Sequence, residues 1–232
     1  MPTYAEIINR MKCAAAANYD EREAHSLALW AVEALTGADR VQLLVDPHRE
    51  VEHVDMEEVE RVERELSEAR PIQYIIGIET FGSLTFEVNP DVLIPRPETL
   101  ELVRWIADDC KAKHPCRILD VGTGSGCIAV SLAKLIQGVE IEAWDISEDA
   151  LQVASRNAKR NDVEVLFRQR DVLSVEPEGK RFEVIVSNPP YISEKEYAEL
   201  DAGVRGFLTS ALSIALYVLL ALSVASTLGI DV

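Results

Sequence analysis

The first part of the chain, residues 1–72, carries apolar residues at the three- and four-residue spacing of amphipathic helices. One apolar stripe runs over residues 27–35. Asp20 stands before it where a helix N-cap belongs, with Glu23 three residues later, and Gly37 follows as a C-cap. A second apolar stripe starts directly after Asp55. This pattern predicts a small N-terminal domain made of helices, over residues 1–72.

The pattern changes after residue 72. Between Tyr74 and Val88 aromatic and β-branched residues recur around Gly77 and Gly82, which is typical of a β-hairpin. We therefore expect a hairpin linker over residues 73–90. Pro97 is well placed to begin a helix after it, because proline is favoured in the first turn.

Four short apolar runs in the rest of the chain read as buried strands, at residues 117–121, 139–144, 163–167 and 182–187. Buried runs of this kind are typical of an α/β fold with a parallel sheet. Open α/β sheets bind ligands beyond the carboxyl ends of their strands. The residues that follow each run are therefore the candidates for a functional site.

Three of the four runs end in chemistry that suits a nucleoside. The first runs into a glycine-rich turn that lets a backbone approach a ligand closely, formed by Gly122, Thr123, Gly124, Ser125 and Gly126. The second ends at Asp145, whose carboxylate can accept both hydroxyls of a ribose. The third leads to Asp171 and Val172, where an acid can accept a hydrogen bond from an adenine amino group.

The fourth run ends in Asn188, Pro189, Pro190 and Tyr191. Proline has no backbone donor and fixes the backbone angle φ, so this segment offers mainly carbonyl oxygens to a ligand. Tyr191 adds a flat face. Such a pocket accepts hydrogen bonds from a planar NH2 group and stacks on its plane, which suits chemistry on an amide or an exocyclic amino nitrogen. The alternative is an ordinary loop after a strand.

These stretches together resemble the class I S-adenosylmethionine-dependent methyltransferases, and more narrowly the peptide chain release factor glutamine methyltransferases (the HemK/PrmC family). The narrower resemblance rests on residues 70–77, residues 86–99 with the run Ile-Pro-Arg-Pro-Glu-Thr, the glycine turn and the Asn-Pro-Pro-Tyr segment. It implies a Rossmann-like methyltransferase sheet over residues 91–206, preceded by a helical domain that recognises the release factor and by the hairpin linker.

The resemblance also implies roles for the site residues. Gly122 to Gly126 would cradle the amino-acid end of S-adenosylmethionine, with Asp145 at its ribose and Asp171 with Val172 at its adenine. Asn188 and Pro189 would accept the two hydrogens of the glutamine amide, aligning its nitrogen with the methyl group. Tyr191 would pack on the amide plane, and Pro190 would complete the pocket.

The role of the Ile-Pro-Arg-Pro-Glu-Thr run stays open between two interpretations. Arg96 could cover the entrance for cofactor or substrate, or the whole run, with Glu98 and Thr99, could only pack the linker against the sheet.

Composition favours a cytoplasmic protein, and we expect a monomer. The formal net charge is −17, which speaks against tight binding to nucleic acid, since that affinity depends on Lys and Arg at the phosphates. The four cysteines show no metal-type spacing, so we expect reduced thiols and no metal site. Two alternative functions nevertheless remain: an amino-methyltransferase acting on DNA or RNA, and an inert module that only binds release factors.

The end of the chain departs from the family. Residues 206–230 are 25 consecutive uncharged residues, where the family usually continues with further strands and helices. This apolar tail, taken as 207–232, is long enough for a membrane span, although its Ser and Thr content and the lack of a following basic residue argue against one. A buried helix and a truncated or frame-shifted end are the other interpretations, and we favour the last.

Overall fold

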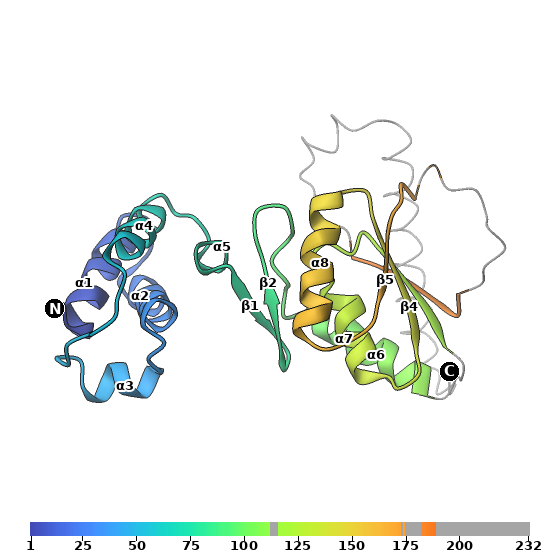
Figure 1. Ribbon diagram of the computed structural model, residues 1–232, viewed down its shortest axis with the longest axis horizontal. Helices are drawn as coiled ribbons and strands as arrows, with labels where there is room; N and C mark the ends of the chain where they lie inside the picture. The colour runs from blue at the N-terminus through green and yellow to red at the C-terminus, as the bar shows by residue number, and fades with distance from the viewer. Residues whose placement is uncertain (112–115, 173, 175–181, 189–232) are drawn as a thin grey trace, which may run out of the picture.

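The computed structural model describes residues 1–111, 116–172, 174 and 182–188, which form a helical N-terminal part, a hairpin and an α/β part (Figure 1). Two predicted features lie outside the described residues: the substrate-binding residues Pro189, Pro190 and Tyr191, and the apolar tail 207–232. In the described ranges, no helix has the length and apolarity needed to cross a membrane. The proposed domain boundaries remain predictions.

The N-terminal part contains the predicted helices. They are α1 (Tyr4–Ala15), α2 (Glu21–Thr36), α3 (Arg40–Val45), α4 (Met56–Ser67) and α5 (Ile72–Ile76). The carboxylate of Asp20 accepts the backbone N–H groups of Arg22 and Glu23 at the start of α2, and Gly37 ends that helix at φ 69°. Asp55 caps α4 in the same way. Buried side chains of α1, α2 and α4 share one core, which confirms the helical prediction for this segment.

The linker differs from the prediction at its beginning. A hairpin does form, with β1 (Ile78–Phe81) and β2 (Leu84–Glu87) paired antiparallel around Gly82. However, residues 72–76 form α5, and Gly77 ends that helix at φ 76°, while its carbonyl accepts the N–H of Val88 at 2.9 Å at the base of the hairpin. The reason lies in Pro71: its carbonyl accepts the N–H groups of Tyr74 and Ile75 at 3.0 and 3.1 Å and so starts a helical turn.

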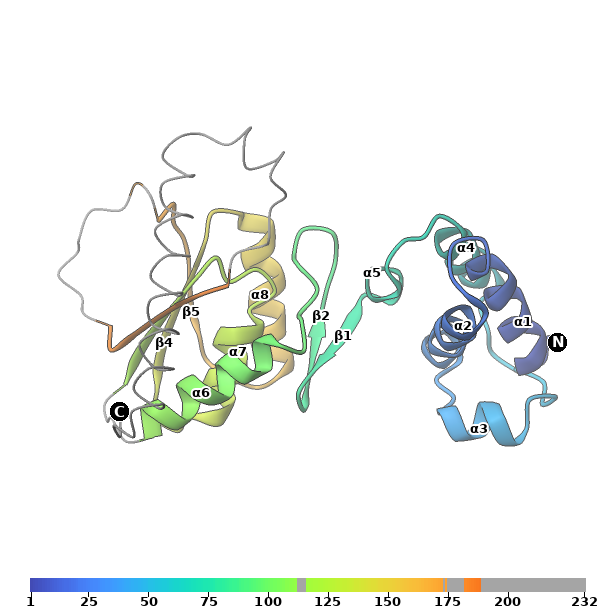
Figure 2. The same ribbon diagram turned by 180° about the vertical axis from the view of Figure 1, so that it is seen from behind.

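In the described residues, the α/β part is a parallel sheet of four strands, as the sequence predicted, and the structure adds their order, β5-β4-β3-β6. Its strands are β3 (Arg117–Val121), β4 (Glu140–Asp145), β5 (Leu166–Gln169) and β6 (Val184–Ser187). Three helices lie on the side of the sheet nearer the hairpin (Figures 1 and 2): α6 (Thr99–Lys111), α7 (Cys127–Leu135) and α8 (Glu148–Arg160). The chain passes from β3 to β4 on one side, and returns to β6 on the other side of β3. That reversal is the switch point at which such sheets bind ligands.

Several element boundaries differ from the prediction. Strand β4 covers Glu140–Asp145 instead of 139–144, and β6 begins at Val184 instead of Phe182. Two further boundaries differ because of local turns. The third strand begins at Leu166 instead of Val163, since the N–H of Val163 still donates to the carbonyl of Ala158 at 3.1 Å in the turn after α8. Helix α6 begins at Thr99 instead of Pro97, because hydrogen-bonded turns occupy residues 96–101.

The hairpin shares its core with the sheet. Phe81 and Phe86 are buried, and their rings meet edge to face with centroids 6.0 Å apart. Both belong to the same buried cluster as Ile118 of β3 and Val130 of α7. The hairpin is therefore packed onto the α/β part, and its aromatic pair fixes the position of the hairpin against the sheet and α7.

Candidate functional site

Strand register brings the predicted residues to one edge of the sheet. Val121, the last residue of β3, is paired with Trp144 on one side and with Ser187 on the other. The next residues along the three strands are Gly122, Asp145 and Asn188, so the three predicted groups follow adjacent strand ends. The register confirms that these strands end at one edge of the sheet, whereas a shared binding site at that edge stays a prediction.

Backbone hydrogen bonds fix the conformation of the glycine turn. The N–H groups of Gly122 and Thr123 both donate to the carbonyl of Trp144, at 2.8 and 3.0 Å. Gly122 and Gly124 have φ of 72° and 53°, and a Cβ atom at either would meet nothing within 4 Å. The turn is thus a bare backbone surface with free space on its open side, the shape that a closely approaching ligand requires.

Gly126 serves packing instead. It has φ 78°, and a Cβ atom there would lie 3.1 Å from the Cβ of Ala154 on α8. A side chain at this position would push α7 and α8 apart. The third glycine therefore keeps the two helices close, whereas the first two keep the turn accessible.

Asp145 is held in one orientation. Its Oδ2 accepts the N–H of Gly124 at 2.9 Å, and its Oδ1 accepts the N–H of Ser147 at 3.0 Å. The side chain is half-buried. Each carboxylate oxygen has a second lone pair, so the group can accept two further hydrogen bonds from a diol while the backbone keeps it in place.

Asp171 follows β5, one strand beyond Asp145. The N–H of Arg170 donates to the carbonyl of Asp145 at 2.9 Å, which joins the two strand ends. The hydroxyl of Ser174 donates to Oδ2 of Asp171 at 2.8 Å. Asp171 and Val172 are both half-buried. The structure therefore places them at the same edge of the sheet as the other predicted residues.

Asp120 is a residue that the sequence reasoning missed. It lies inside β3, 1% exposed, and its Oδ2 accepts the hydroxyl of Thr123 at 2.7 Å. Burial raises the pKa of Asp120 to about 6, against the opposing effects of the Thr123 hydroxyl and the Ala129 backbone N–H; repulsion from Asp145 adds to the rise. A carboxylate thus lies beneath the glycine turn and binds the side chain of its second residue.

Asn157 is a second missed residue. It is fully buried on α8. Its Nδ2 donates to the carbonyls of Glu87 and Ser125, both at 2.9 Å, and its Oδ1 accepts the N–H of Glu87 at 2.6 Å. One amide thereby binds the hairpin and the glycine turn together.

Asn188 is half-buried at the end of β6, and its Nδ2 donates to the hydroxyl of Thr99 at 3.0 Å. Ser187 before it donates its hydroxyl to the carbonyl of Val121 at 2.9 Å, which secures the strand end. Thr99 belongs to the Ile-Pro-Arg-Pro-Glu-Thr run. The structure therefore brings part of that run into contact with the site, whereas among the described residues no hydrogen bond joins Arg96 or Glu98 to Asn188.

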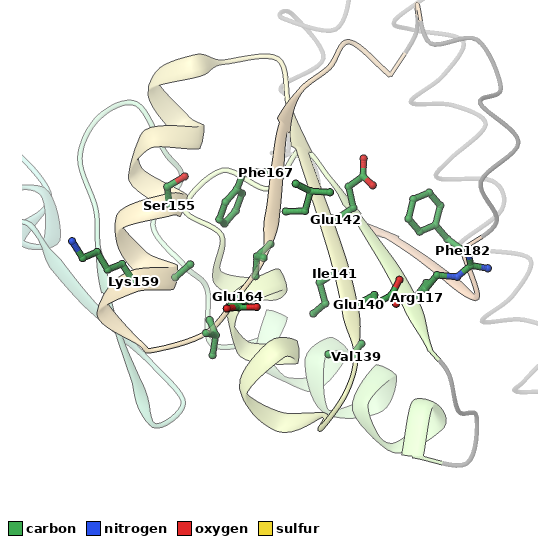
Figure 3. Close-up of a pocket in the computed structure, with 14 residues that line it drawn as sticks. Arg117, Val139, Glu140, Ile141, Glu142, Ser155, Lys159, Glu164, Phe167 and Phe182 are labelled. Carbon is green, nitrogen blue, oxygen red and sulfur yellow. The ribbon is translucent and has the colours of Figure 1, made fainter.

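A cavity of about 860 Å³ lies elsewhere on the sheet (Figure 3). Its lining includes Arg117, Val139 and Glu140, at or just before the starts of β3 and β4, together with Phe182 before β6 and residues of α8 and β5. Of the predicted site residues that the structure describes, none lines it. The cavity is therefore separate from the carboxyl edge. The candidate site at that edge is identified by the hydrogen-bonding groups that its residues present, and not by a cavity.

The chain matches two family models: the PrmC N-terminal domain over residues 6–77 and the methyltransferase small domain over residues 102–213. It is 40% identical over 194 residues to the release factor glutamine methyltransferase of Flavobacterium psychrophilum, covering 82% of this chain and 68% of that protein. It is 40% identical over 187 residues to the one of Bacteroides thetaiotaomicron, covering 80% and 66%. The chain thus spans about two thirds of the length of these relatives.

Among solved structures, a SAM-dependent methyltransferase from Agrobacterium tumefaciens is 18% identical, with a TM-score of 0.41 over 49% of this chain and 39% of that one. Similarity at this level adds nothing to the description of the site.

Proposed function

Because the chain belongs to the release factor glutamine methyltransferase family, we propose that it transfers a methyl group from S-adenosylmethionine to the side-chain amide nitrogen of a glutamine in a peptide chain release factor. The observation that carries this proposal is the meeting of Gly122, Asp145 and Asn188 at adjacent strand ends. That arrangement supports the proposal, because it sets the groups proposed to bind a nucleoside next to a group that can accept hydrogen bonds from an amide.

The residues at this edge fit the proposed cofactor. The open backbone at Gly122 and Gly124 leaves room for its amino-acid end, and the carboxylate of Asp145 is oriented to accept its ribose hydroxyls. Asp171 and Val172 stand at the next strand end, where we propose that the adenine binds. The cofactor supplies a methyl group on a sulfonium cation with a neutral leaving group.

The chain's own task is then alignment. An amide nitrogen is a weak nucleophile, because its lone pair is delocalised into the carbonyl. A carbonyl oxygen that accepts its hydrogens orients that lone pair and stabilises the charge that develops on nitrogen. We assign this task to Oδ1 of Asn188. The backbone carbonyl of Pro189 and the ring of Tyr191 are proposed to share it, as the sequence predicted.

The helical N-terminal part is proposed to recognise the release factor, since it matches the PrmC N-terminal domain over residues 6–77. Residues 1–70 contain 8 Lys or Arg against 16 Asp or Glu. An acidic surface of this kind favours a basic protein partner over a nucleic acid.

The test separates binding from transfer. Calorimetry with S-adenosylmethionine should show saturable binding that Asp145→Ala abolishes and that Asn188→Ala leaves largely intact. Methyl transfer to a purified release factor should be lost in both variants. Asp149→Ala, which removes an exposed carboxylate four residues from Asp145, is the matched control and should behave as wild type.

Three results would contradict the proposal. Transfer that persists in Asn188→Ala would remove that residue from the reaction. Methylation of bare DNA or RNA would identify a nucleic-acid methyltransferase. Capture of the release factor by a chain that transfers no methyl group would identify an inert binding module.

A further inference from the structure

The side chain of Asn188 is fixed by a residue 89 positions earlier in the chain. Its Nδ2 donates to Oγ1 of Thr99 at 3.0 Å. In the part of the chain that the structure describes, Oδ1 of Asn188 accepts no hydrogen bond. The donor end of this amide is therefore engaged by the protein, and the acceptor end remains available.

This distinction matters because the two ends of an amide differ chemically but hardly differ in shape. Rotation of the Asn188 side-chain amide by half a turn would exchange its acceptor and donor atoms. An N–H group in place of Oδ1 would face the N–H groups of an incoming amide substrate, and two donors cannot hydrogen-bond to each other. Orientation of the Asn188 amide thus decides whether the site binds or rejects a planar NH2 group.

We infer that Thr99 is a positioning residue, which holds the amide of Asn188 so that its oxygen faces the amide substrate. The inference rests on the function proposed above and adds a residue to it. Thr99 does not reach the reacting atoms in this scheme. It acts only through Asn188.

Both partners of this hydrogen bond have fixed backbones. Thr99 is 7% exposed at the start of α6, and its N–H donates to the carbonyl of Arg96 at 3.0 Å. Asn188 follows directly on Ser187, which is paired with Val121 in the sheet and also bonds to its carbonyl. A hydrogen bond between two such anchored residues loses little entropy on forming, so it can hold the amide in the orientation that the structure has, with Nδ2 toward Thr99 and Oδ1 away from it.

Two substitutions at Thr99 separate the hydroxyl from the shape of the side chain. Thr99→Val replaces the hydroxyl by a methyl group of nearly the same size, whereas Thr99→Ser keeps the hydroxyl and removes the methyl group. Thr80→Val makes the same chemical change at an exposed position of β1 and serves as the matched control. Thr99→Ala tests the loss of the hydroxyl if the valine variant does not fold.

Steady-state methyl transfer to a release factor gives the first measurement. We expect Thr99→Val to lower kcat about 10-fold, since small misplacements of a reacting group commonly cost one to two orders of magnitude. Calorimetry should show an unchanged Kd for S-adenosylmethionine, and KM for the release factor should stay close to that of the wild type. Thr99→Ser and Thr80→Val should keep kcat within about 2-fold of the wild type, because in both variants residue 99 still has a hydroxyl that can bond to Asn188.

The second measurement needs no substrate. In 15N-resolved NMR spectra the side-chain NH2 signals of Asn188, assigned by their loss in Asn188→Ala, report its hydrogen bond. We expect one of the two protons to shift and to lose protection from solvent exchange in Thr99→Val but not in Thr99→Ser. Because a threonine hydroxyl can also donate, a protected NH2 proton shows in addition that nitrogen, and not oxygen, faces Thr99.

The outcomes are distinct. Equal loss of kcat in the valine and serine variants, or unchanged NH2 signals in Thr99→Val, would overturn the inference. If the wild type methylates no release factor, the proposed function fails, but the NMR measurement still decides whether Thr99 fixes the amide.

Discussion

The buried carboxyl of Asp120 makes a prediction about the stability of the unliganded protein. The perturbation is Asp120→Asn, which keeps the shape of the side chain and the oxygen that accepts the Thr123 hydroxyl, but cannot ionise. The pKa of Asp120 is raised to about 6 from an ordinary 3.8, mainly because burial disfavours the charged form. The wild type must therefore deprotonate a buried group above about pH 6, whereas the variant does not.

The sign and size follow from proton linkage. Between pH 4 and 6 the folded protein holds a proton on Asp120 that the unfolded chain has released, so the contribution of this group to stability falls as the pH rises. A shift of about 2 pKa units corresponds to about 3 kcal/mol. The contribution is greatest below about pH 4, falls through pH 6 and stays constant above it. Relative to the variant, the wild type should lose about 3 kcal/mol between pH 4 and 7.5.

Urea denaturation followed by tryptophan fluorescence measures this difference. Trp144 is the useful reporter, because it lies on β4 paired with Val121, next to Asp120 on β3. Comparing the two proteins at each pH cancels the titration of all other carboxyl groups that the substitution leaves unchanged. Any constant cost of placing an amide in this site also cancels, since only the change with pH is interpreted.

The reasoning would be refuted by a stability difference that stays constant between pH 4 and 7.5. An opposite trend, with the wild type gaining stability relative to the variant as the pH rises, would show that the Thr123 and Ala129 hydrogen bonds outweigh burial. The pKa of Asp120 would then lie below its ordinary value.

Three further predictions concern the contacts that join the elements of the fold. Gly126→Ala should destabilise the protein by about 2–3 kcal/mol in urea denaturation, because the backbone is strained and the new Cβ lies 3.1 Å from α8. Gly138→Ala, which is strained at φ 71° but not crowded, should cost only about 1 kcal/mol. Equal costs in the two variants would show that crowding against α8 does not matter. Asn157→Ala should lower the free energy of unfolding by about 3 kcal/mol or more and speed hydrogen exchange at the Glu87 amide, because it leaves buried backbone groups unpaired. Unchanged exchange at Glu87 would contradict this role of Asn157. Arg61→Ala should lower the free energy of unfolding by about 1 kcal/mol, and by less at high salt, because the half-exposed guanidinium of Arg61 joins two carboxylates of α4 to a carbonyl of α5. A loss that does not depend on salt would show that side-chain packing, and not charge, dominates.

Much of the placement of the candidate site residues could be predicted from sequence, because these residues follow directly on the strands. The glycine turn, Asp145 and Asn188 each stand next to an apolar run, and the rule that parallel strands end at one edge brings them together. The boundaries were less predictable. Pro71 follows the apolar stripe of α4, where a proline usually marks the end of a helix, yet the structure shows that it begins the next one. Turns of this kind depend on single backbone hydrogen bonds that apolar periodicity does not reveal.

The missed residues make contacts that the local pattern does not show. Asn157 binds residues 32 and 70 positions away, and no spacing rule connects them. A signal was nevertheless present: Asn157 lies three residues after Ala154, on the buried stripe of an amphipathic helix, where a polar residue requires partners. Asp120, an acid within a buried apolar strand with Thr123 three residues later, gave a similar signal.

Helix α8 explains how the linker keeps its place relative to the site. The helix begins at Glu148, directly after the turn in which Ser147 binds Asp145, and runs about 20 Å to Arg160. Along its length Ala154 contacts Gly126, and Asn157 holds both strand β2 and the glycine turn. A single rigid element thus joins the ribose-binding end of the proposed site, the glycine turn and the hairpin that leads to the helical N-terminal part. The position of the hairpin is therefore set by the same helix that shapes the cofactor edge, and not by the loop between β2 and α6 alone.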